Sequence, residues 1–164
     1  ALPAAKAKRA NAFTDISGKK CVSDQDGALL CKGLSDWQLE IADEGNIIQL
    51  RIWRTSAPNT ILEFTGRGLG DKAEWRGMQS REGFSPDALI IRMRPVEDDL
   101  LNSSLLYVIR LNPAEACFSG LVDVKANGNA HALARSAADK LPGTCDPHPQ
   151  IYGKRSKATD LFNS

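Results

Sequence analysis

Four cysteines constrain the fold of this chain more than any other feature of its sequence. Cys21 and Cys31 flank the dipeptide Asp26-Gly27, a turn signal that is typical of a short antiparallel hairpin. If Gly27 takes the left-handed position of a three-residue loop, Cys21 lies directly opposite Cys31 on the neighbouring strand. A cross-strand disulfide between them is therefore geometrically available.

The other two cysteines, Cys117 and Cys145, bracket a segment that we expect to be helical. A disulfide between them would tie this helix back to the strand before it. Four cysteines allow three pairings, and the local geometry favours pairing each cysteine with its nearer neighbour. Two disulfides indicate an oxidising compartment, so we expect a periplasmic or secreted protein. The alternatives are four buried free thiols in a cytosolic protein and a zinc site, but no Cys-x-x-Cys or Cys/His spacing supports zinc.

Length and charge restrict the classes of partner. A chain of 164 residues with 42% hydrophobic content predicts one domain with its own core. Its 21 basic and 20 acidic side chains leave no overall field that would attract nucleic acid. No apolar run is long enough to span a bilayer, so we expect no membrane insertion. Because the chain begins with Ala1, we also expect that an export signal has been removed.

The strand pattern predicts one twisted, mostly antiparallel sheet of about six strands. Strands are expected in the residue ranges 37–41, 47–53, 61–64, 73–76, 88–94, 104–111 and 117–124. Most connections between them are short, which suits antiparallel neighbours and excludes a doubly wound parallel sheet. The glycines at 66, 68 and 70 match neither the dinucleotide nor the Walker spacing, so we expect a mobile hairpin loop there.

One segment, residues 129–141, predicts a helix with alanines and leucines along one face. Asn127 or Asn129 can cap its start, and Pro142-Gly143 stops it. Small alanine side chains would let this helix approach a sheet closely. The predicted fold class is therefore α+β: a single domain, mostly antiparallel β-sheet, with one C-terminal alanine-rich helix packed on a face and two disulfides.

The two ends of the chain are expected to lie outside this domain. Residues 1–12 are rich in alanine and predict a flexible lead-in, and residues 154–164 predict a polar C-terminal tail. The single α+β domain is then expected to span residues 13–153.

The residues around both cysteine pairs form a pattern that can be compared with known proteins. The C-terminal part of this pattern consists of the strand 106–111, Cys117, Asp123, the pair Ala126-Asn127, the alanine-rich helix and Cys145. Its front half fits through Cys31-Lys32-Gly33-Leu34 and Glu74-Trp75-Arg76. The arrangement resembles a group of uncharacterised exported proteobacterial proteins and covers most of residues 21–153. This resemblance implies export and disulfide pairing, and it implies no activity or site residue.

Histidine chemistry has few candidates, because His131 and His148 are the only histidines. We interpret His131 as a surface residue beside the apolar stripe of the helix. His148 could act with Asp146 in a hydrolase or a metal-assisted enzyme. Prolines on both sides of His148 more simply indicate a rigid connector. We therefore expect no catalytic residue, no metal and no cofactor.

Arginines on the predicted strands are the strongest candidates for a binding surface. Side chains alternate along a strand, so Arg92 and Arg94 share a face and would bind an anion if further arginines converge on them. The simpler alternative, which we favour, is a solvent face with cross-strand pairs to Glu40, Glu63 and Glu74.

Two tryptophan–arginine dipeptides, Trp53-Arg54 and Trp75-Arg76, would suit a protein interface. We favour core positions for the tryptophans. The candidate binding residues are Arg54, Trp75, Arg76, Arg92 and Arg94.

The function that the sequence favours is a non-enzymatic periplasmic binding or protein-interaction module. Its partner is expected to be another envelope protein or a small anion. The alternative is the hydrolase or metal-assisted enzyme that would use His148 and Asp146.

Overall fold

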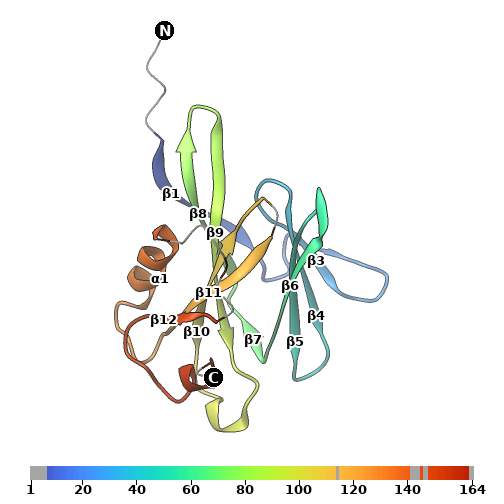
Figure 1. Ribbon diagram of the computed structural model, residues 1–164. Coiled ribbons are helices and arrows are strands. Elements are labelled where there is room, and N and C mark those ends of the chain that lie inside the picture. The colour runs from blue at the N-terminus through green and yellow to red at the C-terminus, as the bar shows by residue number, and fades with distance from the viewer. Residues whose placement is uncertain (1–6, 114, 141–144, 146–147, 163–164) are drawn as a thin grey trace.

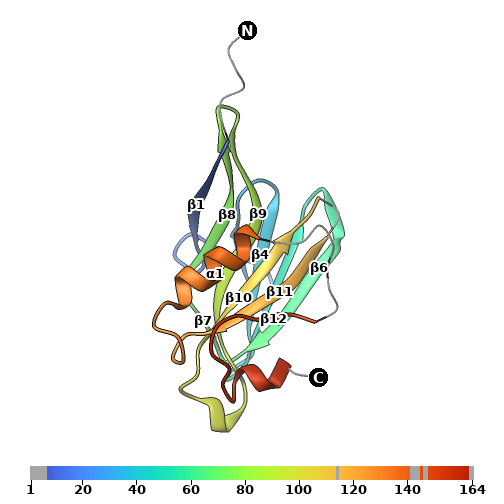
Figure 2. The ribbon, with the colours of Figure 1, turned by 60° about the vertical axis from the view of Figure 1, so that its left-hand side comes forward.

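A computed structural model of the chain describes residues 7–113, 115–140, 145 and 148–162 (Figure 1). Two β-sheets and one helix form three layers, with the larger sheet in the middle. The smaller sheet covers one face of the larger sheet, and the helix crosses its other face (Figure 2). The described residues form a single domain of the predicted α+β class.

The larger sheet has seven strands in the order β1-β8-β9-β10-β11-β12, and β7 pairs separately with β9. Its strands are β1 (Lys8–Asp15), β7 (Gly68–Leu69), β8 (Lys72–Ser80), β9 (Gly83–Arg94), β10 (Leu105–Leu111), β11 (Ala116–Asp123) and β12 (Gln150–Ile151). Every pairing is antiparallel except that of β11 with β12. The expectation of a mostly antiparallel sheet is confirmed.

The smaller sheet has five strands that follow one another along the chain. They are β2 (Val22–Ser23), β3 (Leu29–Lys32), β4 (Trp37–Asp43), β5 (Ile48–Arg54) and β6 (Ala57–Gly66). Ser23 lies opposite Leu29, and Gly27 has a φ of +84°, as the cysteine spacing predicted. The sequence analysis expected one sheet of about six strands, so the second sheet is a correction.

The helix, α1 (Ala130–Asp139), packs against β8, β9, β10 and β11. Ala130, Ala134, Ala137 and Ala138 are buried against the sheet, which confirms the predicted alanine face. Asn129 precedes the helix but makes no side-chain capping hydrogen bond. Two short 3₁₀ helices, η1 (Asp98–Leu100) and η2 (Thr159–Phe162), lie in the connections and near the C-terminus.

Strand β10 is buried along its whole length, because both faces of the larger sheet are covered. Leu105 and Ile109 face the smaller sheet, whereas Leu106 and Val108 face the helix. Tyr107 also faces the smaller sheet, and burial, together with the nearby charge of Glu97, raises the pKa of its hydroxyl to about 12.

The two chain ends differ from the expected lead-in and tail. Strand β1 begins at Lys8 and pairs with β8 along its whole length, so residues 8–12 belong to the domain. In the C-terminal stretch, Thr159 is fully buried and the Phe162 ring lies edge-on to Phe118 at 5.5 Å. The domain therefore includes residues that the composition assigned to flexible ends.

The glycine run at 66–70 is also ordered, where the sequence analysis expected a mobile loop. Gly68 and Leu69 form β7 and pair with Arg94 and Met93 of β9. A Cβ atom on Gly66 would overlap the Met93 side chain. The missing side chain therefore lets the backbone cross from the smaller sheet to the larger one.

Both predicted disulfides are present. Cys21–Cys31 joins two neighbouring strands with a Cα–Cα distance of 4.4 Å, and Cys117–Cys145 has a Cα–Cα distance of 5.8 Å. No cysteine is free.

We predict that each disulfide contributes substantially to stability. Replacing either pair by alanine should lower the free energy of unfolding by about 3 kcal/mol, because the unfolded chain gains loop entropy. The loss should be larger for Cys117→Ala/Cys145→Ala, since that disulfide closes a loop of 28 residues against 10 for the other. Urea unfolding without reductant measures both values, and losses below about 1 kcal/mol would contradict the prediction.

Candidate functional site

Arg54 is held in contacts within the protein. Its guanidinium lies 5.6 Å from the centre of the Trp37 ring and 2.8 Å from a carboxylate oxygen of Asp36. Hydrogen bonds from the Ser56 hydroxyl and from Arg54 hold the pKa of Asp36 well below its ordinary value. These contacts, with a further hydrogen bond from Arg54 to the backbone carbonyl of Pro113 at 3.0 Å, hold Arg54 at the end of β5, opposite the start of β4.

Trp75 and Arg76 are neighbours in β8, but they point to opposite faces of the sheet. Trp75 is fully buried in the core, where its Nε1 donates to the Thr14 hydroxyl at 2.9 Å. Arg76 faces the helix side and pairs with Asp139 at 2.6 Å. The tryptophan therefore anchors the core, as we favoured, and the arginine fastens the C-terminal end of α1.

Asp139 is the centre of an ion-pair network. It accepts hydrogen bonds from Arg76 of β8 and from Arg9 of β1. Arg9 also pairs with Asp87 of β9. Burial opposes the charged form of Asp139, but the two arginines outweigh that effect and hold the pKa of the carboxyl below its ordinary value.

A different environment surrounds Arg92, at the N-terminal end of α1. It lies on a hollow of about 350 Å³ between the helix and the face of the larger sheet. We call this the helix-side hollow; its lining residues are Phe13, Gly70, Asp71, Lys72, Glu74, Ile90, Arg92, Leu106 and His131. The residues come from β1, β8, β9, β10, α1 and the β7–β8 connection.

Some charged side chains of the helix-side hollow are paired within the protein, and others are free to contact a ligand. Glu74 is buried and pairs with Arg135 of α1 at 2.6 Å. Arg92 is exposed and forms no ion pair within the part of the chain that the structure describes; its Nη2 lies 3.2 Å from Nε2 of His131. Arginine has only donors, so this histidine nitrogen accepts the hydrogen bond. Arg92 therefore presents a positive charge that forms no ion pair with a carboxylate of the described residues, although the Asp71 side chain also lines the hollow.

The strand arginines do not form one surface. Arg92 and Arg94 are both exposed on the helix side, as strand alternation predicts, and the guanidinium of Arg94 lies over Gly68. Arg76 lies beside Asp139 and Arg92 beside His131, and these two helix positions are about 12 Å apart along α1. The arginines are therefore distributed among separate contacts.

The alternative of a solvent face with cross-strand ion pairs applies to the charged side chains of the smaller sheet. Arg51 of β5 pairs across strands with Glu63 at 2.9 Å and with Glu40 at 3.9 Å. Glu74 also pairs with an arginine, but that arginine comes from the helix. Cross-strand pairing therefore accounts for the outer face of the smaller sheet.

The residues of the enzyme alternative are only partly visible. His148 is exposed just before β12, and Asp146 lies outside the described residues. His148 does not line the helix-side hollow or any of three further hollows among the described residues.

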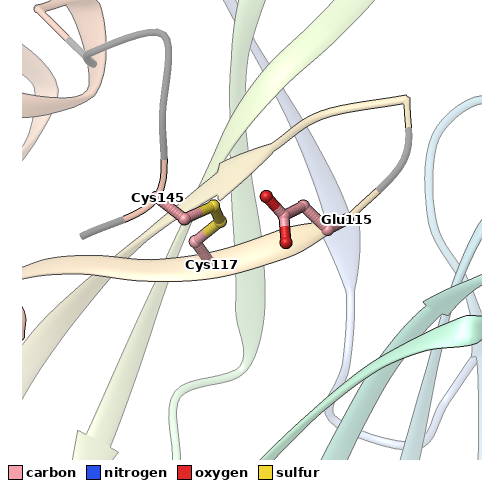
Figure 3. Close-up of side chains that lie close together, drawn as sticks. All are labelled: Glu115, Cys117 and Cys145. Atoms are coloured by element: carbon pink, nitrogen blue, oxygen red, sulfur yellow. A yellow bond between two sulfur atoms is a disulfide. The ribbon is translucent and has the colours of Figure 1, made fainter. Parts of the chain in front are cut away.

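One group of metal-ligand side chains occurs among the described residues. Ligand atoms of Glu115, Cys117 and Cys145 lie within 4.8 Å of one another (Figure 3). The two sulfur atoms are joined in the disulfide, so neither is the thiolate that binds a metal. The two cysteines of this group therefore serve as a covalent link between β11 and the chain after the helix.

Sequence reasoning missed two residues that shape the helix-side hollow. Phe13 lies in β1 with 52% of its surface exposed, and we had placed it at the boundary of the lead-in. His131 is exposed, as we expected, but the sequence did not show that it contacts Arg92. The Arg9, Asn11 and Phe13 alternation was an available signal for β1, although it does not show which strand pairs with it.

Comparisons with family models, with curated proteins and with solved structures found no match for this chain. None of the helices in the described residues has the length and apolar character needed to cross a membrane.

We predict that the Asp139 network stabilises the fold in a pH-dependent way. Asp139→Asn should lower the free energy of unfolding at neutral pH by about 1 to 2 kcal/mol, because Arg9 and Arg76 lose a charged acceptor. The pKa of Asp139 in the folded protein lies below the ordinary value of 3.8. The stabilisation is therefore complete at pH values above 3.8, and it disappears as the pH falls through the lowered pKa of the folded state.

Urea titrations of both proteins from pH 7 to pH 2.5 measure the effect. The gap in unfolding free energy between wild type and variant should close on acidification. The exposed Asp26→Asn is the control, since Asp26 forms no ion pair with any described residue. A gap that stays constant down to the lowest pH would show that the charge of Asp139 does not matter.

Proposed function

We propose that this protein is a non-enzymatic binding module that holds a small anionic ligand with an apolar part in the helix-side hollow. The single observation that carries the proposal is the exposed Arg92 guanidinium, which lines a hollow together with Phe13 and Ile90 and forms no ion pair within the part of the chain that the structure describes. A guanidinium in this position can pair with the anionic group of a ligand.

The lining of the hollow supports a ligand with two chemically different ends. Ile90 and Leu106 are 3% and 2% exposed and belong to the core beneath the helix, and Phe13 adds a largely exposed ring. Arg92 and Lys72 supply donors for a carboxylate or phosphate. A ligand would therefore place its apolar part against Phe13 and its anionic group toward Arg92.

The size of the hollow favours a small molecule over a protein surface. Its volume of about 350 Å³ lies near the lower end of the range for small-molecule sites. An acidic side chain of another envelope protein offers similar chemistry and is the alternative partner.

We also propose that the protein works in the periplasm or outside the cell. Two disulfides and no free cysteine support an oxidising compartment. The proposed kinship with exported proteobacterial proteins agrees with this location. The enzyme alternative stays a hypothesis, because Asp146 lies outside the described residues.

We predict that Arg92 dominates the affinity for an anion. With 4-phenylbutyrate as the probe, Arg92→Gln should weaken binding by about tenfold or more, since a charge-assisted hydrogen bond is lost. Isothermal titration calorimetry at low ionic strength measures the dissociation constants. The neutral amide 4-phenylbutyramide should bind wild-type protein and Arg92→Gln equally weakly.

The matched control is Arg81→Gln, which removes an exposed arginine at the β8–β9 turn. It should leave the affinity unchanged, as should His148→Ala, which removes the histidine of the enzyme alternative. Equal affinity of wild type and Arg92→Gln for the probe would refute the proposed site.

A further inference from the structure

A second hollow lies at one end of the molecule, where the two sheets meet. It has a volume of about 420 Å³. We call it the end hollow; its lining residues are Ile16, Ser17, Gly27, Leu29, Ile41, Asp43, Ile48, Leu69, Gly70 and Asp71. They come from the segment after β1, from β7 and the residues after it, and from the β3, β4 and β5 end of the smaller sheet.

The lining of the end hollow is aliphatic and open. Ile16 and Ile41 are nearly buried, at 4% and 7% exposure, and both belong to the core between the sheets. Leu29, Ile48 and Leu69 pack against the same core but keep part of their surface exposed. The core is therefore incompletely covered at this end by the residues that the structure describes.

Carboxylates surround this aliphatic opening. Asp43 and Asp71 lie on its rim. A neighbouring hollow of about 400 Å³, which we call the outer hollow, shares Gly27 and Asp43 with it. The outer hollow adds the acidic side chains Asp24, Asp26, Glu40 and Glu44.

These charges are not balanced locally. Within the part of the chain that the structure describes, Asp26, Asp43, Glu44 and Asp71 form no ion pair with a lysine or arginine. Arg51 is the basic residue that lines the outer hollow, and it pairs with Glu63 and Glu40. The chain as a whole carries a formal charge of +1, so this excess of carboxylates is a local feature of the two hollows.

We propose that the end hollow and the outer hollow together bind an extended basic peptide segment of a partner protein. An apolar side chain of that segment enters the end hollow and covers Leu29, Ile48 and Leu69. Lysine or arginine side chains on either side of it face the carboxylates of Asp43 and Glu44. This site is separate from Arg92 and selects the opposite charge.

Two features favour a peptide over a small cation. The two hollows are neighbours that share Gly27 and Asp43 in their linings, so an extended chain can reach both. The carboxylates come from separate segments: Asp24 and Asp26 lie between β2 and β3, and Asp43 and Glu44 lie where β4 ends. Charges spaced in this way match several side chains of one peptide better than one compact cation.

The direct test is a titration with a fluorescein-labelled peptide of sequence Lys-Lys-Leu-Lys-Lys, followed by fluorescence anisotropy at low ionic strength. The peptide should bind, and replacing its leucine by serine should weaken binding by about tenfold, because the aliphatic contact is lost. Added salt should also weaken binding, since the carboxylates are exposed.

The protein variant that tests the site is Asp43→Asn/Glu44→Gln. Neither residue lines the helix-side hollow, and an asparagine at 43 can still accept the hydrogen bond from the backbone N–H of Gly45. The variant should bind the peptide about tenfold more weakly, because two opposing charges are removed. The matched control, Glu82→Gln/Glu115→Gln, changes the net charge equally and should keep at least half of the affinity.

Three results would overturn the proposal. The serine peptide could bind as tightly as the leucine peptide, the control variant could lose as much affinity as Asp43→Asn/Glu44→Gln, or the protein could associate with itself through this end. Sedimentation equilibrium of the wild-type protein and of Asp43→Asn/Glu44→Gln, each without peptide, tests for self-association. Arg92→Gln should leave peptide binding unchanged, so failure of the anion site and failure of the peptide site are distinguishable.

Discussion

The burial of β10 on both faces is the constraint on which the rest of the structure depends. A strand with Leu105, Tyr107 and Ile109 on one side and Leu106 and Val108 on the other needs a cover on each side. The smaller sheet supplies one cover, and α1 supplies the other. Because α1 has only ten residues, it shields part of the face and leaves the helix-side hollow beside its first turn. The same layering ends the core at the end hollow, where the two sheets meet.

Covalent and polar contacts fix the chain that surrounds α1. The Cys117–Cys145 disulfide fastens the chain that follows the helix to β11. Asp123 accepts hydrogen bonds from the backbone N–H of Ala126 and from the Ser156 hydroxyl, and Asn127 accepts one from the backbone N–H of Lys154 at 2.8 Å. Both Asp123 and Asn127 are buried, so their side chains connect the start of the helix to the C-terminal segment. These residues are part of the pattern on which the family resemblance rests, and in this structure they hold the fold together.

The parts of the fold that depend on residues close in sequence could be predicted, whereas the parts that depend on residues far apart in sequence could not. The Cys21–Cys31 hairpin and α1 were predictable because turn residues, spacing and an alanine face are local signals. The second sheet was missed, although the run of five apolar or aromatic residues from Leu105 to Ile109 in β10 is typical of a strand that is covered on both faces. Strand β1 was missed because its residues are mostly alanine and polar side chains, which are uncommon in strands, and its order comes from pairing with β8, which lies far away in the sequence. Phe162 was hidden in a polar stretch, and only the three-dimensional structure brings it to Tyr107 and Phe118.

The candidate site was less predictable, because proximity along a strand differs from proximity in space. Trp75 and Arg76 are adjacent in sequence, but the period of two sends one into the core and the other to the helix. The same period correctly placed Arg92 and Arg94 on an exposed face. The partners of Arg92 in its hollow come from four or more distant segments, and no local pattern relates Phe13 to His131. The two hollows share Gly70 and Asp71, yet the helix-side hollow presents Arg92, which forms no ion pair with a described residue, whereas the end hollow and the outer hollow present mainly carboxylates. A formal charge of +1 therefore hides an acidic region, and a composition near neutrality excludes an overall field without excluding charge-selective sites.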